Sequence, residues 1–287
     1  MEINGYDEMT GENNYIVHPE IFLACTEKKQ RVLEQIIPEH ILTHVYTGKI
    51  NVTTADKTYV IAQGETALFS RNQLAKFTKE PEGEMPCKAA TVFFTQSFLQ
   101  TFYMDLPLEK QKVNNPRVLQ IKQHALLDHL FESILFYANQ NDAVITGELA
   151  LLKVKEAITV VRMIDKNADF LLSDFTEPHK TDLADFMQKN FMFNIPISRF
   201  AYLTGRSLAT FKRDFQKTFG TSPQKWLTEI RLQKAHFLIA ENNQKPSQAY
   251  IEAGFENFSH FTYAFKRFFG YKPSSIFEPV NTQYLSL

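Results

Sequence analysis

Apolar and polar residues alternate with a period of two in the first third of the chain, in short runs that end at turn-forming residues. In Lys49–Thr53, Ile50 and Val52 alternate with polar neighbours, as expected of a strand with one buried face. Similar runs cover residues 43–48, 58–62, 66–69 and 89–94, with turns at 54–57 and 63–65. Short strands at this spacing predict an antiparallel barrel or jelly roll over about residues 16–113.

The period changes after this region. Between residues 116 and 165 the apolar positions recur at threes and fours, which predicts two amphipathic helices. The first includes Val118, Leu119, Ile121, Leu126, Leu127, Leu130, Phe131, Ile134 and Leu135, and the second spans Glu148 to Met163. Such helices either close one end of the barrel or present an apolar stripe to a second copy, and we expect a homodimer formed through them.

Two polar, turn-rich stretches then separate this part from the rest. They are residues 165–169 and 177–181, and Pro178 in the second is a natural stop before a new domain. The sequence therefore predicts a regulatory or dimerisation domain over residues 1–165, a linker over 166–180 and a second domain over 181–287.

From Leu183 onward the chain is predicted to be helical, and one pattern occurs twice. Each copy is a short helix, a turn at Gly205 or Gly254, and a longer helix, 206–220 or 256–270, that ends at a glycine. Glycine at the turn supplies the positive φ that lets two helices cross sharply. Ser207 and Asn257 are suitable N-caps, and Gly220 and Gly270 suitable stops. One connecting helix, from Pro223 to Glu241, joins two helix-turn-helix units.

The longer helices are predicted to be amphipathic, with phenylalanines on the buried face. The expected core positions are Leu208, Phe211, Phe215 and Phe219 in the first, and Phe258, Phe261, Phe265 and Phe268 in the second. The outward faces carry Ala209, Thr210, Arg213, Gln216 and Lys217, with Lys212 at the edge, then Ser259, His260, Tyr263, Lys266 and Arg267. Such faces can enter a major groove, where Arg pairs with guanine and Lys with phosphates; the alternative is a solvated basic face of a helical bundle.

The distribution of charge along the chain supports DNA binding by these helices. Residues 181–287 carry 13 Lys and Arg against 8 Asp and Glu, whereas residues 1–180 carry 18 against 24, within a chain of net charge −1. A basic third beside an acidic two-thirds indicates that the C-terminal part meets a polyanion. The chain is 44% apolar and 22% charged, has no signal-like N-terminus and no apolar run near the ~20 residues of a membrane span. We expect a cytoplasmic protein without membrane contact.

Enzyme chemistry has little support in the sequence. Small barrels of the cupin type often hold a metal, and His40 and His44 are the candidates, but no third ligand follows at a matching spacing. Two partly exposed strand histidines are the interpretation we favour. Cys25 and Cys87 cannot build a disulfide scaffold or a four-cysteine zinc site. No paired carboxylates, phosphate loop or nucleophile elbow appears, so we expect neither catalysis nor a metal or other cofactor.

The residues of the C-terminal third resemble the AraC family of transcription regulators. The first half of the resemblance runs from Ala201 through Gly205, Ser207, Phe211, Arg213, Phe215, Gly220 and Ser222 to Pro223. Arg231, Leu232, Ala235 and Leu238 are similar to the connecting helix. The second half comprises Gly254, Phe255, Ser259, Phe261, Phe265, Lys266, Arg267, Gly270 and Pro273.

The resemblance implies two recognition helices in successive major grooves of one DNA face, about 34 Å apart. The family's base-reading positions fall on Ala209, Lys212 and Arg213, then Ser259, His260, Thr262 and Tyr263. Arg206, Ser207, Thr210, Lys217, Lys266 and Arg267 complete the expected DNA-binding set. Many members have arginine where this chain has Tyr263.

The resemblance extends to the preceding domain, a cupin-like regulatory barrel followed by dimerising helices. Residues 206–215 and 259–261 are also similar to the ExsA-like branch, which includes activators controlled by protein partners. The implied fold is α+β multidomain: an N-terminal cupin-like antiparallel β-barrel with flanking helices, then an all-α domain with two helix-turn-helix units.

The implied function is a sequence-specific regulator, an activator, that binds operator or promoter DNA and contacts RNA polymerase under control of a small-molecule or protein effector. Two alternatives remain open: a cupin-type metal enzyme with an accessory helical domain, and an architectural DNA binder indifferent to sequence.

Overall fold

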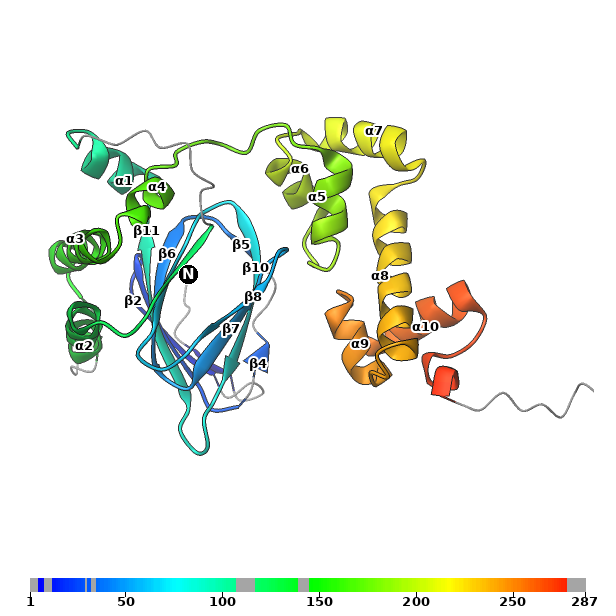
Figure 1. The fold of residues 1–287 in the computed structure, drawn as a ribbon, viewed down its shortest axis with the longest axis horizontal. Helices are drawn as coiled ribbons and strands as arrows, with labels where there is room; N and C mark the ends of the chain where they lie inside the picture. Colours follow the sequence, from blue (N-terminus) through cyan, green and yellow to red (C-terminus); the bar gives the residue numbers. More distant parts are fainter. Residues whose placement is uncertain are drawn as a thin grey trace, which may run out of the picture. The chain divides into compact units, whose positions relative to one another are not determined.

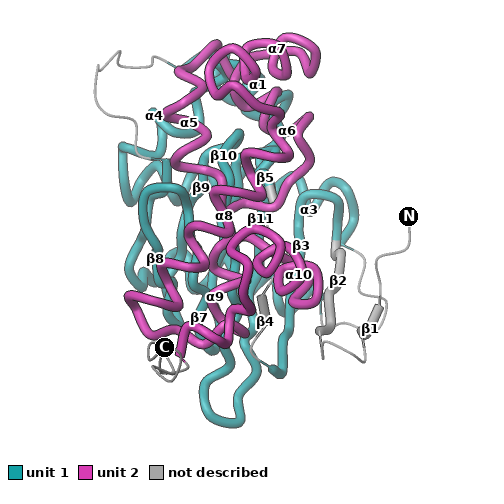
Figure 2. The backbone as a smooth tube through the Cα atoms, turned by 90° about the vertical axis from the view of Figure 1, so that its right-hand side faces the viewer, with its two compact units in different colours: residues 1–177 teal, residues 178–287 magenta. Residues whose placement is uncertain are grey.

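A computed structural model describes residues 5–7, 12–28, 30–31, 35–106, 117–138 and 145–277. The chain divides into two compact units, residues 1–177 and 178–287, coloured separately in Figure 2. The division falls inside the segment expected to be a linker, immediately before Pro178.

The first unit contains two antiparallel sheets within the described residues (Figure 1). The larger has the order β1 (Gly5–Asp7), β2 (Glu12–His18), β3 (Ile21–Thr26), β11 (Cys87–Phe94), β6 (His40–Thr47), β9 (Thr66–Phe69) and β12 (Val118–Ile121). The smaller has the order β4 (Gln30–Arg31), β10 (Gln73–Glu80), β7 (Lys49–Thr53) and β8 (Thr58–Ile61), and β5 (Gln35–Ile37) also pairs with β10.

Period-two alternation along β6 divides its side chains between two hydrophobic cores. Ile41 and Val45 point into a cluster that also contains Val52 of β7 and Phe77 of β10, so this cluster lies between the two sheets. Leu42, on the opposite face, belongs to a second cluster shared with helices. Both faces of β6 are therefore covered, which is why six consecutive residues from His40 are buried.

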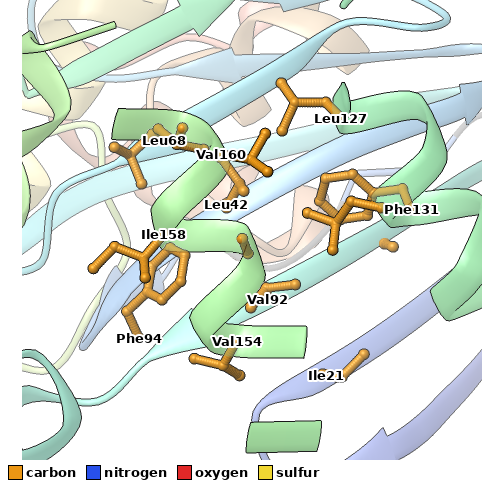
Figure 3. Close-up of a cluster of buried hydrophobic side chains, with 14 of the residues drawn as sticks. Ile21, Leu42, Leu68, Val92, Phe94, Leu127, Phe131, Val154, Ile158 and Val160 are labelled. Atoms are coloured by element: carbon orange, nitrogen blue, oxygen red, sulfur yellow. The ribbon is translucent and has the colours of Figure 1, made fainter. Parts of the chain in front are cut away.

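Helices cover the outer face of the larger sheet. They are α1 (Gln96–Tyr103), α2 (Ala125–Ala138), α3 (Gly147–Ile164) and α4 (Asn167–Leu172). Figure 3 shows Phe131 of α2 and Val154 and Ile158 of α3 packed with Leu42 and Val92 of the sheet. Tyr46 Oη donates a hydrogen bond to the Phe131 carbonyl at 2.7 Å, which fastens α2 to the sheet.

The structure corrects three details of the sequence prediction in this unit. Residues 118–121, expected to begin a helix, form β12, because pairing with β9 satisfies their backbone while Val118 and Ile121 are buried. Helix α1, within the expected barrel, was not predicted. Residues 167–172 of the expected linker form α4, because Ala168, Leu171 and Leu172 have helical spacing and join the helix-covered core.

The second unit is helical throughout its described residues. Its elements are α5 (Leu183–Asn190), α6 (Ile197–Leu203), α7 (Leu208–Phe219), α8 (Pro223–Ala240), α9 (Pro246–Glu252), α10 (Phe258–Phe269) and a 3-10 turn at Pro273–Phe277. The predicted order of two helix-turn-helix units around a connecting helix is confirmed. None of the helices in the described residues is long and apolar enough to cross a membrane.

Candidate nucleic-acid interface

The first helix-turn-helix consists of α6 and α7, joined at Gly205. Gly205 has a φ of +62°, and a Cβ there would lie 2.4 Å from the carbonyl carbon of His179. Glycine is required for both reasons, since the left-handed region disfavours other residues and the adjacent backbone occupies the space of a side chain. The α7 helix begins at Ser207, whose Oγ accepts from the Thr210 amide at 3.2 Å, and ends at Gly220 with a φ of +69°.

Arg206 holds this unit together from the inside. Its side chain is only 6% exposed, and it donates to the carbonyl oxygens of Thr204 (2.8 Å) and Thr181 (3.0 Å) and to Asp214 Oδ2 (3.2 Å). The hydrogen bond from Arg206 lowers the pKa of the Asp214 carboxyl. The expected DNA-binding residue Arg206 is therefore committed to internal bonds, because the turn brings its guanidinium under α7.

The second unit, α9 and α10, repeats this construction. Gly254 has a φ of +98°, and a Cβ there would lie 2.6 Å from the Met192 carbonyl oxygen. Arg231 of α8 stabilises the same region by donating to the carbonyls of Phe191 (2.8 Å) and Phe193 (2.9 Å). Asn257 Oδ1 accepts from the His260 amide at 2.9 Å and caps α10. The caps and stops predicted from the sequence are confirmed in both units.

The two longer helices lie near opposite ends of α8 (Figure 1). This helix begins at Pro223 behind the N-cap Ser222 and has 18 residues, which corresponds to about 27 Å of helix. Residues of α7 and α10 correspond at an offset of 50 positions, from the caps Ser207 and Asn257 to the stops Gly220 and Gly270. The second unit therefore presents α7 and α10 as two equivalent helices, which are separated by α8.

The outward faces of α7 and α10 carry most of the predicted DNA-binding side chains. Arg213 has a side chain that is 76% exposed, and Tyr263, its counterpart at the offset of 50, is 67% exposed. Exposed with them are Ser207, Ala209, Lys212, Lys217, Ser259, His260, Lys266 and Arg267, whereas Thr210 and Thr262 are half-buried. Each helix thus offers one polar face that a groove could accept.

Phenylalanines form the buried face of each helix, with one correction. Phe211 and Phe215 of α7 and Phe261 and Phe265 of α10 are fully buried, as predicted. Leu208, Phe258 and Phe268 were also predicted to be core residues, but they are 41%, 43% and 43% exposed. They lie at the margins of the apolar stripe, where neighbouring side chains cover them only in part; Phe258, for example, contacts the ring of Tyr250 of α9 at 5.2 Å between centroids.

Gln216 of α7, which the sequence pattern places on the outward face, is exposed between Arg213 and Lys217 and corresponds to Lys266 on α10. Sequence reasoning did not single out Tyr202 of α6, which is 39% exposed beside the turn. The exposure of Tyr202 depends on tertiary packing.

His40 and His44, the candidate metal ligands, lie on the helix-covered face of β6. They are 0% and 3% exposed, so the expectation of partly exposed residues was wrong. The His44 ring stacks on Phe131 at 4.7 Å between centroids, and its Nδ1 hydrogen-bonds with Thr66 Oγ1 at 2.9 Å. His40 Nδ1 accepts from the Arg71 amide at 3.3 Å. Burial lowers the pKa of both imidazoles to about 4.

These contacts give both rings a structural role in the first unit, residues 1–177. The described residues contain no group of three His, Cys, Asp or Glu side chains placed to hold a metal ion. The alternative of a metal enzyme therefore finds no support in the geometry around His40 and His44.

Comparison with known proteins matches both units. The chain is 28% identical over 236 residues to the virulence regulon transcriptional activator VirF of Yersinia enterocolitica, covering 79% of this chain and 84% of VirF. It is 26% identical over 231 residues to the HTH-type transcriptional regulator ExsA of Pseudomonas aeruginosa, covering 79% and 82%. An apo structure of a ToxT variant from Vibrio cholerae aligns with a TM-score of 0.44 at 13% identity, over 89% of this chain and 95% of ToxT.

The family matches follow the division of the structure. Residues 200–278, which contain both turns and both exposed helices, match the model of a helix-turn-helix domain. Residues 40–172, which contain most of the two sheets and all four covering helices, match the model of the ExsA N-terminal regulatory domain. The chain belongs to the AraC family of DNA-binding transcription regulators.

Proposed function

We propose that this protein activates transcription by reading two successive major grooves of one duplex, with α7 in one and α10 in the next. The observation that carries the proposal is the duplicated unit, in which two capped helices with exposed polar faces lie near the two ends of α8. The roughly 27 Å of α8 is of the same order as the spacing of two major grooves on one face of B-DNA, about 34 Å.

Each exposed side chain has a role in this arrangement. Ala209, Lys212 and Arg213 face base edges from α7, and Ser259, His260, Thr262 and Tyr263 do so from α10. Lys217, Lys266 and Arg267 lie in the last turns of their helices, where they meet phosphates. Ser207 and Thr210 form the N-terminus of α7 beside the DNA backbone, where amide groups favour anions. Arg206 positions the turn.

The regulatory unit, in this proposal, controls DNA binding as a homodimer. Four large apolar side chains on α2 and α3 are strongly exposed: Phe136 (64%), Leu151 (56%), Leu152 (62%) and Met163 (71%). Exposed apolar side chains of this size are typical of an interface. A second copy of the same helices would cover them and bring two DNA-binding units to one promoter.

The direction of control follows from the relatives. VirF is named a transcriptional activator, and we assign the same direction to this protein, which then acts in the cytoplasm on promoter DNA and contacts RNA polymerase. A small-molecule or protein effector acting on the regulatory unit would set its activity. A reporter gene behind the selected operator should respond positively to the protein, and repression would contradict the assignment.

The test of DNA reading is selection from a random duplex library by the full chain, followed by sequencing. We expect a motif of two conserved blocks about one helical turn apart. A single block would contradict reading by both helices. Binding without any enriched motif, lost as salt rises, would instead establish the architectural alternative. A chain with both Arg213→Ala and Tyr263→Ala is the control, and it should enrich both blocks more weakly, with the preference relaxed at one base in each.

A further inference from the structure

The two recognition helices differ chemically at equivalent positions. At the offset of 50, Lys212 corresponds to Thr262 and Arg213 to Tyr263. The cations of α10 are Lys266 and Arg267, both in its last turn, whereas α7 carries Lys212 and Arg213 in its middle. The N-terminal half of a recognition helix is the part that reaches base edges, so the base-reading part of α10 carries neither Lys nor Arg.

The geometry of Thr262 makes this part of α10 more apolar than its sequence suggests. Thr262 Oγ1 donates a hydrogen bond to the Phe258 carbonyl oxygen, one turn earlier, at 2.9 Å. The hydroxyl proton is thus donated within the helix, so the side chain can offer a base its methyl group or the acceptor oxygen, but no donor. Beside it, the ring of Tyr263 is 67% exposed.

The corresponding surface of α7 is cationic. The Arg213 side chain is 76% exposed, and its Nε lies 3.7 Å from Oδ1 of the neighbouring Asp214. Arginine and lysine pair preferentially with the O6 and N7 acceptors of guanine in the major groove, whereas methyl and aromatic groups contact the C5-methyl of thymine.

We propose that the two helices read different bases: α7 selects guanine through Arg213, and α10 selects thymine through the Tyr263 ring and the Thr262 methyl. The inference rests on the proposed two-groove reading. It makes the operator asymmetric, with one guanine-containing block and one block defined by thymine methyl groups. Lys266 and Arg267 anchor α10 on the phosphates, while Ser259 and His260 supply the polar contacts to base edges beside the thymine contact.

The test uses the full chain and a duplex taken from the random-library selection. Arg213→Ala should relax one block, which assigns it to α7 and the other to α10. Each thymine of the α10 block is then replaced by deoxyuridine, which removes only the C5-methyl group, and affinity is measured by fluorescence anisotropy. We expect the contacted position to bind about fourfold more weakly, the equivalent of one buried methyl group. The same replacement in the α7 block is the matched control.

Variants of Tyr263 test whether its ring makes the thymine contact. Because the Tyr263 side chain is exposed, these variants should fold normally. Tyr263→Phe keeps the ring and should keep the sensitivity to deoxyuridine. Tyr263→Ala should lose that sensitivity at the thymine that the ring contacts, whereas a thymine contacted by the Thr262 methyl stays sensitive. Tyr263→Arg should shift the selected base at one position from thymine to guanine. A wild-type α10 block with guanine at that position, or no effect of deoxyuridine, would overturn the inference while leaving two-groove reading intact. A one-block motif would overturn both.

Discussion

Arg206 Nε lies 3.2 Å from Asp214 Oδ2, and the same guanidinium donates to the Thr181 carbonyl at 3.0 Å. The pair therefore joins the entry to α5, the turn and the middle of α7. An arginine placed between a glycine turn and a recognition helix resembles a DNA contact in sequence. Its 6% exposure makes it a residue that positions α7.

Arg206→Ala is expected to destabilise the DNA-binding unit by about 2–3 kcal/mol, because carbonyl acceptors lose a charged donor that is itself buried. Urea unfolding of the full chain, followed by the fluorescence of Trp226 in this unit, measures the change. Arg213→Ala is the matched control, since its exposed side chain should leave the unfolding midpoint nearly unchanged. Equal stability of the two variants would contradict the positioning role of Arg206.

Gly205→Ala is expected to cost about 2–4 kcal/mol, through the left-handed φ and the contact of its Cβ with the His179 backbone. Gly220→Ala separates the two causes. Gly220 also has a positive φ, but a Cβ there meets nothing within 4 Å, so the cost should be about 1–2 kcal/mol. Measured free energies of unfolding should therefore fall further for Gly205→Ala than for Gly220→Ala. An equal loss of stability in the two variants would show that close packing at Gly205 is unimportant.

Acid should weaken the regulatory unit through His40 and His44. Burial lowers the pKa of each to about 4, so the unfolded state, with a pKa near 6.5, binds protons first as pH falls. The stabilisation from each neutral histidine is complete above about pH 6.5 and declines toward pH 4, by about 3 kcal/mol at most.

Chemical unfolding of wild type and His44→Phe at pH 7 and pH 4.5 tests this pH dependence. Phenylalanine keeps the stack on Phe131 but cannot be protonated, so the variant should lose less stability between the two pH values. An identical loss in both proteins would show that His44 is not part of the acid response.

Arg213→Ala should cost about 1–3 kcal/mol on the selected operator and relax the preference at one base, because a bidentate contact to guanine is lost. Lys217→Ala should weaken binding to all duplexes by a similar factor and reduce the salt dependence, because phosphate contacts carry no sequence information. Anisotropy titrations with the operator and a scrambled duplex separate the two. Equal losses on both duplexes for Arg213→Ala would refute base reading.

Leu152→Glu should weaken self-association by about tenfold or more, because it places a charge within the exposed apolar surface of α3. Sedimentation velocity over a range of protein concentrations measures the change. Val60→Glu is the control, since Val60 is 48% exposed but lies on β8, outside these helices. A wild-type protein that stays monomeric at micromolar concentration would contradict the homodimer.

Much of the DNA-binding unit could be predicted from the sequence, because its signals are local. Gly205 and Gly254 adopt the positive φ that their turn positions indicated, and Ser207 and Asn257 cap the helices that follow. Capping bonds and left-handed turns involve residues within a few positions of one another, so a one-dimensional pattern contains them. Assignment of individual side chains to DNA contact remains a prediction.

The structure of the regulatory unit, residues 1–177, was harder to predict, because its decisive contacts join residues that are distant in the sequence. Residues 118–121 have apolar positions compatible with a helix, yet they pair with β9, about 50 residues earlier. His40 and His44 have the spacing of a possible metal pair, but their burial depends on contacts distant in the sequence, such as that of His44 with Phe131 of α2. Neither the strand at residues 118–121 nor the burial of the two histidines can be predicted from a short stretch of sequence.

Local sequence patterns were sufficient to predict the doubled helix-turn-helix, its caps and turns, and the polar composition of the two recognition faces, since helical periodicity and turn chemistry are local properties. The tertiary structure was needed to show that Arg206 is internal and that both histidines are buried. Each of these depends on which distant atoms or which rotamer complete a hydrogen bond or exclude water, and that is settled when the elements pack together.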